Sequence, residues 1–379
     1  MRKLIALGLG ALLLVAASSA VAADIEVMTQ NQFLGADLNP LIAAFGTPQQ
    51  DEVIAATLEQ MAANNFPLRA RALAKQICDK QPHVVALQEV FRFSIDGASG
   101  APLPLPFIDH LDELMRAIAR QCGNYIVAAS VRNIDVGAPA PGIGLIGFTD
   151  RDVILTRADV SFERVRFNLA CNHPAPSGVS GVLPSGCNYG ALVPLPAPLG
   201  FILRGFVGVD ALVGGVVHRV VNTHLEVMKP DGSILSTFFQ AAQASELLAT
   251  LALFPRSPGA RTIVLGDFNS SPDDAVDTTL VFVPPYAQLA AGVDLFSDPI
   301  SAPYTDVWPL RPGRPSGLTC CHQTDLSSRR TALRERIDLI FSLEVPDRVR
   351  AVVMGDEPAD RIRRLWPSDH ATVHGELSY

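Results

Sequence analysis

Polar side chains follow several predicted strands, each at the point where a buried apolar run ends. Asn31 follows the first such run, Glu89 the second and His224 a later one. Asp267 and Asn269 follow another run two positions apart, so their carboxylate and amide share one face of an extended segment. A polar group just past a buried strand is held rigidly and still reaches solvent, which is how catalytic groups are commonly presented.

Taken one at a time, these residues also have ordinary structural explanations. Asn31 could be a turn former, Glu89 a solvated acid and His224 a hydrogen-bonded structural histidine. The alternative chemistry is that Glu89 holds a hard divalent cation through oxygen. The run Gly266-Asp267-Phe268-Asn269 is the sharper pattern, because the glycine lets a backbone or a ligand approach closely.

A second histidine near the C-terminus has two candidate carboxylate partners. The chain reads Arg336-Ile337-Asp338 and later Ser368-Asp369-His370. A carboxylate that accepts the Nδ1 proton of His370 would fix its tautomer and orient Nε2 for acid or base catalysis. Asp369 is adjacent in sequence and would point to the opposite face of an extended segment, so Asp338 is the favoured partner.

The elements that must position these residues alternate short apolar strands with amphipathic helices. Periodicity predicts strands over 25–29, 84–87, 125–129, 152–156, 201–209, 216–222, 262–265, 336–341, 349–354 and 372–377. It predicts helices over 53–64, 69–80, 108–121 and 237–253. The strands at 201–209 and 216–222 are joined too closely for a helical crossover and should form an antiparallel hairpin through 210–215. The sheet is therefore mixed, unlike that of a dinucleotide-binding fold.

Long stretches without periodicity separate these elements, over 93–107, 132–150, 167–199 and 270–334. Stretches of this length are either functional or loosely ordered. No linker divides the chain, and the polar clusters run from end to end, so we expect one catalytic domain over 23–379.

The N-terminal segment has the three parts of a secretory signal peptide. A basic start at Arg2 and Lys3 precedes an apolar run and a small-residue cleavage site, so we expect a signal peptide over 1–22 and a secreted or periplasmic protein. An uncleaved anchor is the alternative, although the run is short for a bilayer span. Cleavage would deepen the formal net charge from −8 to −10. With no global positive field, any polyanion must be held by a local site.

Composition excludes two broad classes of protein. Apolar residues make up 48% of the chain and charged residues 18%, which provides for a full core and excludes intrinsic disorder. The mean hydropathy of +0.25 could indicate a polytopic membrane protein, but only the N-terminal run is long and apolar enough to span a bilayer.

Six cysteines fit an oxidising compartment and allow three disulfides in fifteen connectivities. Cys171 and Cys187 bracket a loop that a disulfide would staple, and Cys78 and Cys122 each end a helical pattern and could face one another. The adjacent Cys320 and Cys321 could pair with each other or with other partners. A zinc site is the alternative, but no paired CxxC spacing supports it.

Together, six segments in order resemble the endonuclease/exonuclease/phosphatase superfamily, which includes deoxyribonuclease I and neutral sphingomyelinases. They are Asn31, Gln88-Glu89, Asn222-Thr223-His224, Gly266-Asp267-Phe268-Asn269, Arg336-Ile337-Asp338 and Ser368-Asp369-His370. The resemblance covers about the whole mature chain. It implies a four-layer α/β/β/α sandwich, with two mixed and largely antiparallel sheets flanked by helices.

The resemblance also implies a Mg²⁺-dependent phosphodiesterase, with Mn²⁺ or Ca²⁺ as alternative ions. Glu89 would be the principal metal ligand, with Asn31 and Asp369 beside it. Asp267 would orient or deprotonate the attacking water, His224 and Asn269 would hydrogen-bond the phosphoryl oxygens, and Asp338 would pair with His370. This agrees with the needs of in-line attack on phosphorus, which are a metal, a positioned water and donors to the equatorial oxygens.

Two departures from the family patterns limit what we expect of the metal site and of the substrate. Phe33 stands where some members carry an acid, so a second metal carboxylate is not expected there. The signatures of the inositol phosphatases are absent: Ile263-Val264-Leu265 and Arg334-Glu335-Arg336 stand in their places. A phosphoinositide phosphatase is therefore not expected.

The expected partner of a monomeric enzyme is a phosphodiester in nucleic acid or in a phospholipid head group. A nuclease could use the arginines of one loop, and a lipid enzyme with peripheral membrane contact could use apolar loops at 103–107, 192–202 and 281–286. The loop arginines are Arg311, Arg314, Arg329, Arg330 and Arg334. A catalytically silent binding or effector protein on the same scaffold is the alternative, although none of the catalytic residues has been lost.

Overall fold

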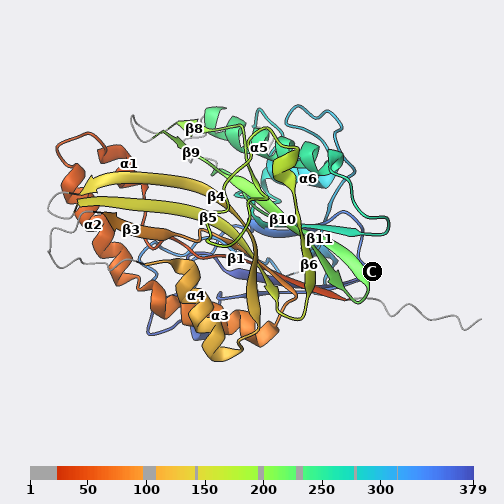
Figure 1. Cartoon of the computed structure of the whole chain (residues 1–379), viewed down its shortest axis with the longest axis horizontal. Coiled ribbons are helices and arrows are strands. Elements are labelled where there is room, and N and C mark those ends of the chain that lie inside the picture. The colour runs from red at the N-terminus through yellow and green to blue at the C-terminus, as the bar shows by residue number, and fades with distance from the viewer. Residues whose placement is uncertain are drawn as a thin grey trace, which may run out of the picture.

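Two large sheets pack face to face in the computed structural model, which describes residues 24–96, 108–140, 144–194, 200–227, 234–276, 280–313 and 315–379. The signal segment predicted over 1–22 and the apolar loop at 103–107 lie outside the described residues. Figure 1 shows the two sheets in the middle of the molecule, with helices on their outer sides. No helix among the described residues is both long enough and apolar enough to span a bilayer.

The first sheet contains the N- and C-terminal strands side by side. Its order is β15 (Arg348–Met354), β16 (Thr372–Ser378), β1 (Ile25–Asn31), β2 (Val84–Gln88), β5 (Gly144–Arg157) and β3 (Arg92–Asp96), and β4 (Tyr125–Ala140) also pairs with β5. Among these pairs only β1 and β2 run parallel.

The second sheet is built on the same plan. Its order is β13 (Thr305–Asp306), β14 (Asp338–Ser342), β12 (Arg261–Asp267), β11 (Val216–His224), β10 (Gly205–Val213) and β6 (Ser161–Val165), and β7 (Cys187–Asn188) also pairs with β10. Here only β11 and β12 run parallel. The short strands β8 (Val193–Pro194) and β9 (Phe201–Ile202) pair separately.

Helices cover the outer face of each sheet. The first sheet is covered by α1 (Asn39–Ala44), α2 (Gln50–Ala63), α3 (Phe66–Lys80) and α4 (His110–Gln121), and the second by α5 (Ile234–Leu253) and α6 (Pro285–Ala291). Short 3₁₀ turns occur at Phe167–Leu169, Asp274–Val276, Trp308–Leu310 and Pro358–Asp360. Three apolar cores separate the layers, one under each set of helices and one between the sheets. The four-layer α/β/β/α sandwich is therefore confirmed.

The predicted helix over 69–80 begins three residues earlier, because Asn65 caps it. The Asn65 side chain accepts a hydrogen bond from the backbone N–H of Leu68, and Pro67 stands in the first turn, where its missing N–H costs nothing. The next helix begins in the same way, since Asp109 accepts from the backbone N–H of Leu111.

Two predictions about strands are wrong. The stretch 132–150 is not irregular: most of it belongs to the long antiparallel pair of β4 and β5, whose register shifts at Val127/Ala129 and Arg132/Asp135 interrupt the alternation. The strand predicted over 201–209 is divided between β9 and β10. The hairpin of β10 and β11 does form, but it turns at Gly214-Gly215, two residues with positive φ, as a two-residue hairpin turn requires.

All six cysteines are in disulfides, which overturns the zinc alternative. Cys78 bonds Cys122, Cys171 bonds Cys187 as a staple across its loop, and Cys320 bonds its neighbour Cys321.

Candidate active site

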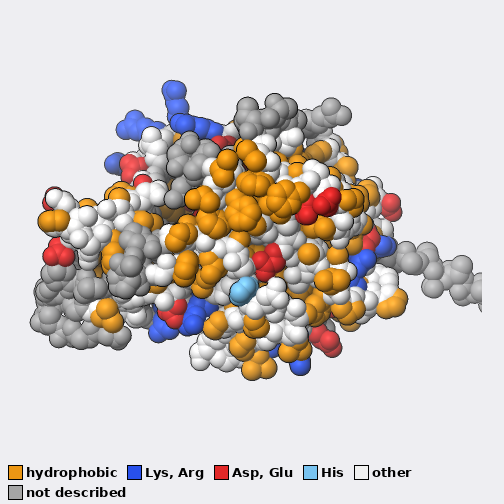
Figure 2. Space-filling view, turned by 90° about the horizontal axis from the view of Figure 1, so that it is seen from above, with side chains coloured by type: hydrophobic (Ala, Val, Ile, Leu, Met, Phe, Trp, Pro, Cys, Tyr) orange, Lys and Arg blue, Asp and Glu red, His pale blue; other side chains and the backbone are white. Residues whose placement is uncertain are grey.

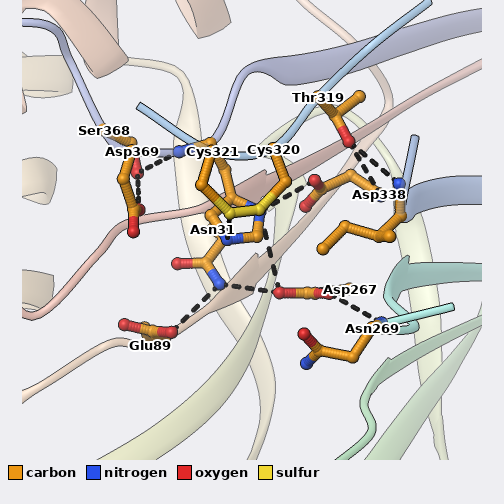
Figure 3. The surroundings of a disulfide bond; sticks show 12 residues. Asn31, Glu89, Asp267, Asn269, Thr319, Cys320, Cys321, Asp338, Ser368 and Asp369 are labelled. Atoms are coloured by element: carbon orange, nitrogen blue, oxygen red, sulfur yellow. Dashed lines mark hydrogen bonds and ion pairs between the residues drawn. A yellow bond between two sulfur atoms is a disulfide. The ribbon is translucent and has the colours of Figure 1, made fainter. Parts of the chain in front are cut away.

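The carboxyl ends of both parallel strand pairs meet at one rim of the sandwich. The parallel pair β1 and β2 delivers Asn31 and Glu89 there, and β11 and β12 deliver His224 and Asp267. The sheets are joined at this rim by the side chains of Gln88 and Asn222, whose Nε2 and Oδ1 lie 2.6 Å apart. The eight polar residues predicted from the sequence therefore come together, and Figure 3 shows most of them.

A close approach of backbones fixes the position of Asp267. Gly266 has a φ of +150°, and a Cβ atom placed on it would lie 1.9 Å from the carbonyl oxygen of Thr223 on the neighbouring strand. Any side chain at this position would push β11 and β12 apart. The glycine predicted to permit close approach is thus required by the backbone, one residue before the carboxylate.

The Asn31 amide bridges two carboxylates. Its Nδ2 donates to Oε1 of Glu89 at 3.2 Å and to Oδ2 of Asp267 at 3.0 Å, while its Oδ1 accepts from the backbone N–H of Phe33. The other Glu89 oxygen accepts from the backbone N–H of Leu34 at 3.1 Å. The two carboxylates from different sheets are thereby held on either side of one amide.

His370 is paired with Asp338, as the sequence favours. Its Nδ1 lies 2.8 Å from Oδ2 of Asp338 and 3.7 Å from Oδ2 of Asp267. Burial alone would lower the pKa of His370, but the carboxylates of Asp338, Asp267 and Asp369 outweigh it and raise that pKa well above its ordinary value. His370 is therefore an imidazolium ion at neutral pH.

His224 reaches the same carboxylate from the other side. Its Nε2 lies 3.6 Å from Oδ2 of Asp267, and its Nδ1 lies 3.1 Å from a guanidinium nitrogen of Arg204. Burial, then Arg204 and His370, lower the pKa of His224 well below its ordinary value, so the ring is neutral. Because an arginine can only donate, Nδ1 must accept and the ring proton must lie on Nε2.

Asn269 is only partly free to bind a ligand. Its Nδ2 donates to the carbonyl oxygen of Leu225 at 2.9 Å, and its backbone N–H donates to Asp267 at 2.9 Å. One amide proton and Oδ1 remain for a substrate. Asn269 and Glu89 both have positive φ, of 47° and 54°, and such strained backbone is common at functional sites.

The oxygen donors that follow strands of the first sheet are of the kind that bind a divalent cation. Glu89, Asp369 and Asn31 offer the hard oxygen ligands that Mg²⁺ and Ca²⁺ prefer. Burial, followed by repulsion from Glu89, raises the pKa of Asp369, while His370 and Arg69 oppose that rise. Burial, followed on the raising side by repulsion from Asp338, likewise raises the pKa of Asp267. The site thus gathers more negative charge than its side chains neutralise, which is the condition that a bound cation relieves.

Sequence reasoning missed a buried polar cluster behind His224. The carboxylates of Asp150 and Asp152 both accept from Nδ2 of Asn133, at 3.3 and 2.9 Å, and the guanidinium of Arg204 lies 3.5 Å from Glu226. Burial raises the pKa of both aspartates, with Asp150 also raising that of Asp152, and Arg204 opposes the rise. The alternation of Asp150 and Asp152 on one strand face was the available signal, but Asp150 fell in the stretch predicted to be irregular and Asp152 at the start of a separate predicted strand.

Sequence reasoning also missed Arg69, whose buried side chain holds together backbone segments next to the rim. Its fully buried guanidinium donates to four backbone carbonyl oxygens, those of Asn64, Gln32, Phe33 and Pro367. These contacts tie the segment after β1 to the segment before His370. Burial lowers the pKa of Arg69 to about 10, and the charges of Asp369 and Glu89 oppose that change.

The segment around the adjacent cysteines lies across the two segments that carry His370 and Asp338. Oγ1 of Thr319 accepts from the backbone N–H groups of Ile337 and Asp338, and the carbonyl oxygen of Thr319 accepts from Ala371. Sγ of Cys321 lies 3.9 Å from Nε2 of His370. Figure 3 shows the disulfide in this position. The segment that carries the adjacent cysteines is therefore part of the candidate site.

An endonuclease/exonuclease/phosphatase protein from Beutenbergia cavernae has a similar structure, with a TM-score of 0.53 and 19% identity over 94% of this chain and 72% of that chain. Weaker matches are a family protein from Leptotrichia buccalis (TM-score 0.49, 13% identity, 94% and 100% coverage) and a mannosyl-6-phosphatase from Bacteroides thetaiotaomicron (0.49, 14%, 94% and 100%). At these identities the likeness concerns the fold.

The sequence itself matches a family model over most of its length. No protein with a curated description matches the chain in sequence. The model of the endonuclease/exonuclease/phosphatase family, however, matches residues 59–370, a range that includes every candidate residue except Asn31. The chain therefore belongs to the Endonuclease/Exonuclease/phosphatase family.

Proposed function

We propose that the protein is an exported, divalent-metal-dependent phosphodiester hydrolase that uses water as the nucleophile. The observation that carries this proposal is the position of Asp267, a buried carboxylate between a neutral histidine and a charged one. Such an arrangement offers a proton acceptor and two different proton donors around one small space. Hydrolysis of a phosphodiester needs these groups together.

Each side chain has one role in the proposed reaction. Asp267 orients the attacking water and accepts its proton as the new P–O bond forms and the P–O bond to the leaving oxygen breaks. Nε2–H of His224 and the free amide proton of Asn269 hydrogen-bond the phosphoryl oxygens, and His370, held by Asp338, stabilises the charge that develops there. Glu89, Asn31 and Asp369 would hold the cation, which supplies the positive charge that neutralises the phosphate in the transition state.

The test is hydrolysis of bis(p-nitrophenyl) phosphate by the mature protein with Mg²⁺, Mn²⁺ or Ca²⁺ and with EDTA. We expect EDTA to abolish turnover and Asp267→Asn to lower kcat at least about a hundredfold, the range for loss of a general base. Undiminished turnover in both EDTA and the variant would contradict the proposal. Export is tested separately by the N-terminal sequence of the secreted protein, expected to begin directly after the segment 1–22.

A lipid phosphodiester is the second candidate substrate, because an apolar surface lies beside the site. Gln240 near the start of α5 donates to the carbonyl oxygen of Asn269, and the first turn of α5 exposes Ile234 and Leu235. Val281 and Phe296 are exposed nearby, where Phe296 packs on Phe282. Figure 2 looks onto the side of α5 and α6, where hydrophobic side chains gather over the middle and Lys and Arg lie toward the edges.

A further inference from the structure

Five exposed arginines gather on two loops beside the catalytic histidine, and none of them forms an ion pair within the described part of the chain. They are Arg329, Arg330, Arg334, Arg363 and Arg364, which we call the arginine surface. Of the other loop arginines singled out from the sequence, Arg311 lies over the Trp308 ring and Arg314 is outside the described residues. Unpaired charge concentrated in one place is unusual in a chain that is acidic overall.

The two loops are fastened to each other and to the site. Trp366 donates from its backbone N–H to Leu326 and from its ring N–H to Ser328, which joins the loop before His370 to the loop that carries Arg329. The Trp366 ring stacks on His322 with centroids 3.9 Å apart, and the backbone N–H of His322 donates to the backbone carbonyl oxygen of Asp369. The arginine surface is therefore held in a fixed position relative to His370.

The backbone at Arg363 and Arg364 is strained in order to place these side chains. Ile362 and Leu365 exchange two backbone hydrogen bonds, at 2.8 and 3.0 Å, so the two arginines are the central residues of a tight turn. Their φ angles are 46° and 80°. Such turns favour Asn-Gly, because positive φ at both central positions is energetically unfavourable for most other residues. Two adjacent arginines there indicate that their charges serve a purpose other than the turn.

No acid of the same two loops forms an ion pair with these arginines within the described part of the chain. These acids are Asp325, Glu335, Asp356, Glu357 and Asp360. Both oxygens of Asp325 accept from Ser327, and one oxygen of Asp360 accepts from the backbone N–H groups of Gly355 and Glu357. The loops also lack an apolar anchor for a bilayer, because no large exposed apolar side chain occurs between Leu310 and Val345 among the described residues. A ligand with several spaced phosphates fits the arginine surface better than a lipid membrane does.

We propose that the arginine surface binds the phosphate backbone of a nucleic acid while one phosphodiester of the same strand occupies the site at Asp267. This inference rests on the proposed function and assigns its substrate class. Phosphate contacts by arginine fix the register of a strand without reading its sequence, so cleavage would be largely independent of sequence.

The experiment uses a variant that keeps the turn and removes its charge. In Arg363→Asn/Arg364→Gly the turn takes its preferred residues, so the fold should be retained. The control is Arg348→Ser/Arg350→Ser, which removes two arginine charges from β15, on the part of the first sheet where Arg348 lies opposite Ser378 at the end of β16 away from His370. Unlike the turn arginines, these two form ion pairs, with Asp24 and Glu376. Binding of a labelled 20-nucleotide single strand and of its duplex is measured by fluorescence anisotropy in EDTA, so that binding does not depend on turnover.

We expect the turn variant to bind at least one of the two DNA probes at least about tenfold more weakly than the wild-type protein, with a shallower dependence of log K on log salt by about 1 to 2. Its turnover of bis(p-nitrophenyl) phosphate should stay within about twofold of wild type. An equal loss in the control variant, unchanged binding in the turn variant, or wild-type binding to phosphatidylglycerol vesicles but not to DNA would overturn the inference. Failure of the small substrate alone would instead contradict the proposed function.

Discussion

His224 and His370 approach the same oxygen of Asp267 at nearly the same distance, yet the protein gives them opposite charges. His370 faces three carboxylates, and its pKa lies well above the ordinary value. His224 faces the guanidinium of Arg204, and its pKa lies well below. Both rings are buried, so exposure does not distinguish them. Burial lowers the pKa of both rings, so their opposite charges follow from their neighbours: three carboxylates surround His370, whereas Arg204 and His370 lie near His224.

Each histidine belongs to its own polar network, and both networks join the two sheets. His370 and Asp338 lie beside the cysteine segment, whereas His224 belongs to a network of Arg204, Glu226 and the two aspartates of β5. In the network of His370 the positive charge is on the ring beside Asp267. In the network of His224 the ring is neutral and the positive charge is on its neighbour Arg204. Variants of the Nδ1 partners can therefore test each histidine on its own.

The largest expected effect comes from removing the charged histidine. In His370→Ala the imidazolium proposed to stabilise the phosphoryl charge is lost, and kcat on bis(p-nitrophenyl) phosphate should fall at least about a hundredfold. His224→Ala removes one hydrogen bond from a neutral donor, so in this variant kcat should fall less, by about tenfold. Steady-state kinetics of the two variants at pH 7 measure this, and a larger loss in His224→Ala would reverse the comparison.

A smaller effect is expected from the partner of the neutral histidine. In Arg204→Met, Nδ1 of His224 loses its donor and the nearby positive charge, so the proton can move to Nδ1 and the pKa of the ring rises. The groups that face this ring are Arg204, Asp267 and His370. We expect kcat to fall about fivefold and the ¹⁵N signals of the His224 ring to change.

Arg204→Lys is the matched control for that prediction, because it keeps the charge near Nδ1. Loss of the guanidinium also leaves buried carboxylates without their cation, which destabilises a protein. Thermal unfolding of both variants shows whether the fold is retained. If the ring signals of His224 are the same in Arg204→Met as in wild type, Arg204 does not determine its tautomer.

The sequence predicted which polar residues stand at the ends of strands better than it predicted which distant residues contact them. Asn31, Glu89, His224 and Asp267 were recognisable because each interrupts an apolar run just as a strand ends. The pairing of His370 with Asp338 followed from the period of an extended chain. These are local properties, and the structure bears out the convergence that they predicted.

Contacts between distant segments could not be read in the same way. Arg204 fell inside a predicted strand that the structure divides, and Asp150 belonged to a stretch predicted to be irregular. Register shifts in β4 hide the alternation that would have revealed a strand pair. Which charge faces a buried histidine depends on packing between the sheets, and no period in the sequence encodes that.

The smallest expected effect concerns the carboxylates behind Arg204. Burial raises the pKa of Asp150 to about 6, so the folded protein binds this proton more tightly than the unfolded chain does. Because the carboxyl pKa is raised in the folded state, the free energy of unfolding decreases as the pH rises from about 4 to about 6. At higher pH the whole of this destabilisation is present. Asp150→Asn should therefore increase the free energy of unfolding by about 1 kcal/mol at pH 8 and have little effect at pH 4.

Urea denaturation of wild type and Asp150→Asn at both pH values measures this difference. Asp210→Asn is a control for the loss of a more exposed acid, since Asp210 pairs with Arg219 and its removal should not stabilise the protein. A gain that is equal at pH 4 and pH 8 would show that the charge of Asp150 carries no cost in the folded state.

The rim at which the two parallel strand pairs meet also determines when activity can appear during folding. The hydrogen bond between Asn31 and Asp267 joins residues 236 positions apart, and His370 stands only nine residues before the C-terminus. Contacts between such distant segments form late, after the cost of closing long loops has been met. Turnover should therefore recover together with the last phase of refolding, and partly folded chains should have no partial activity.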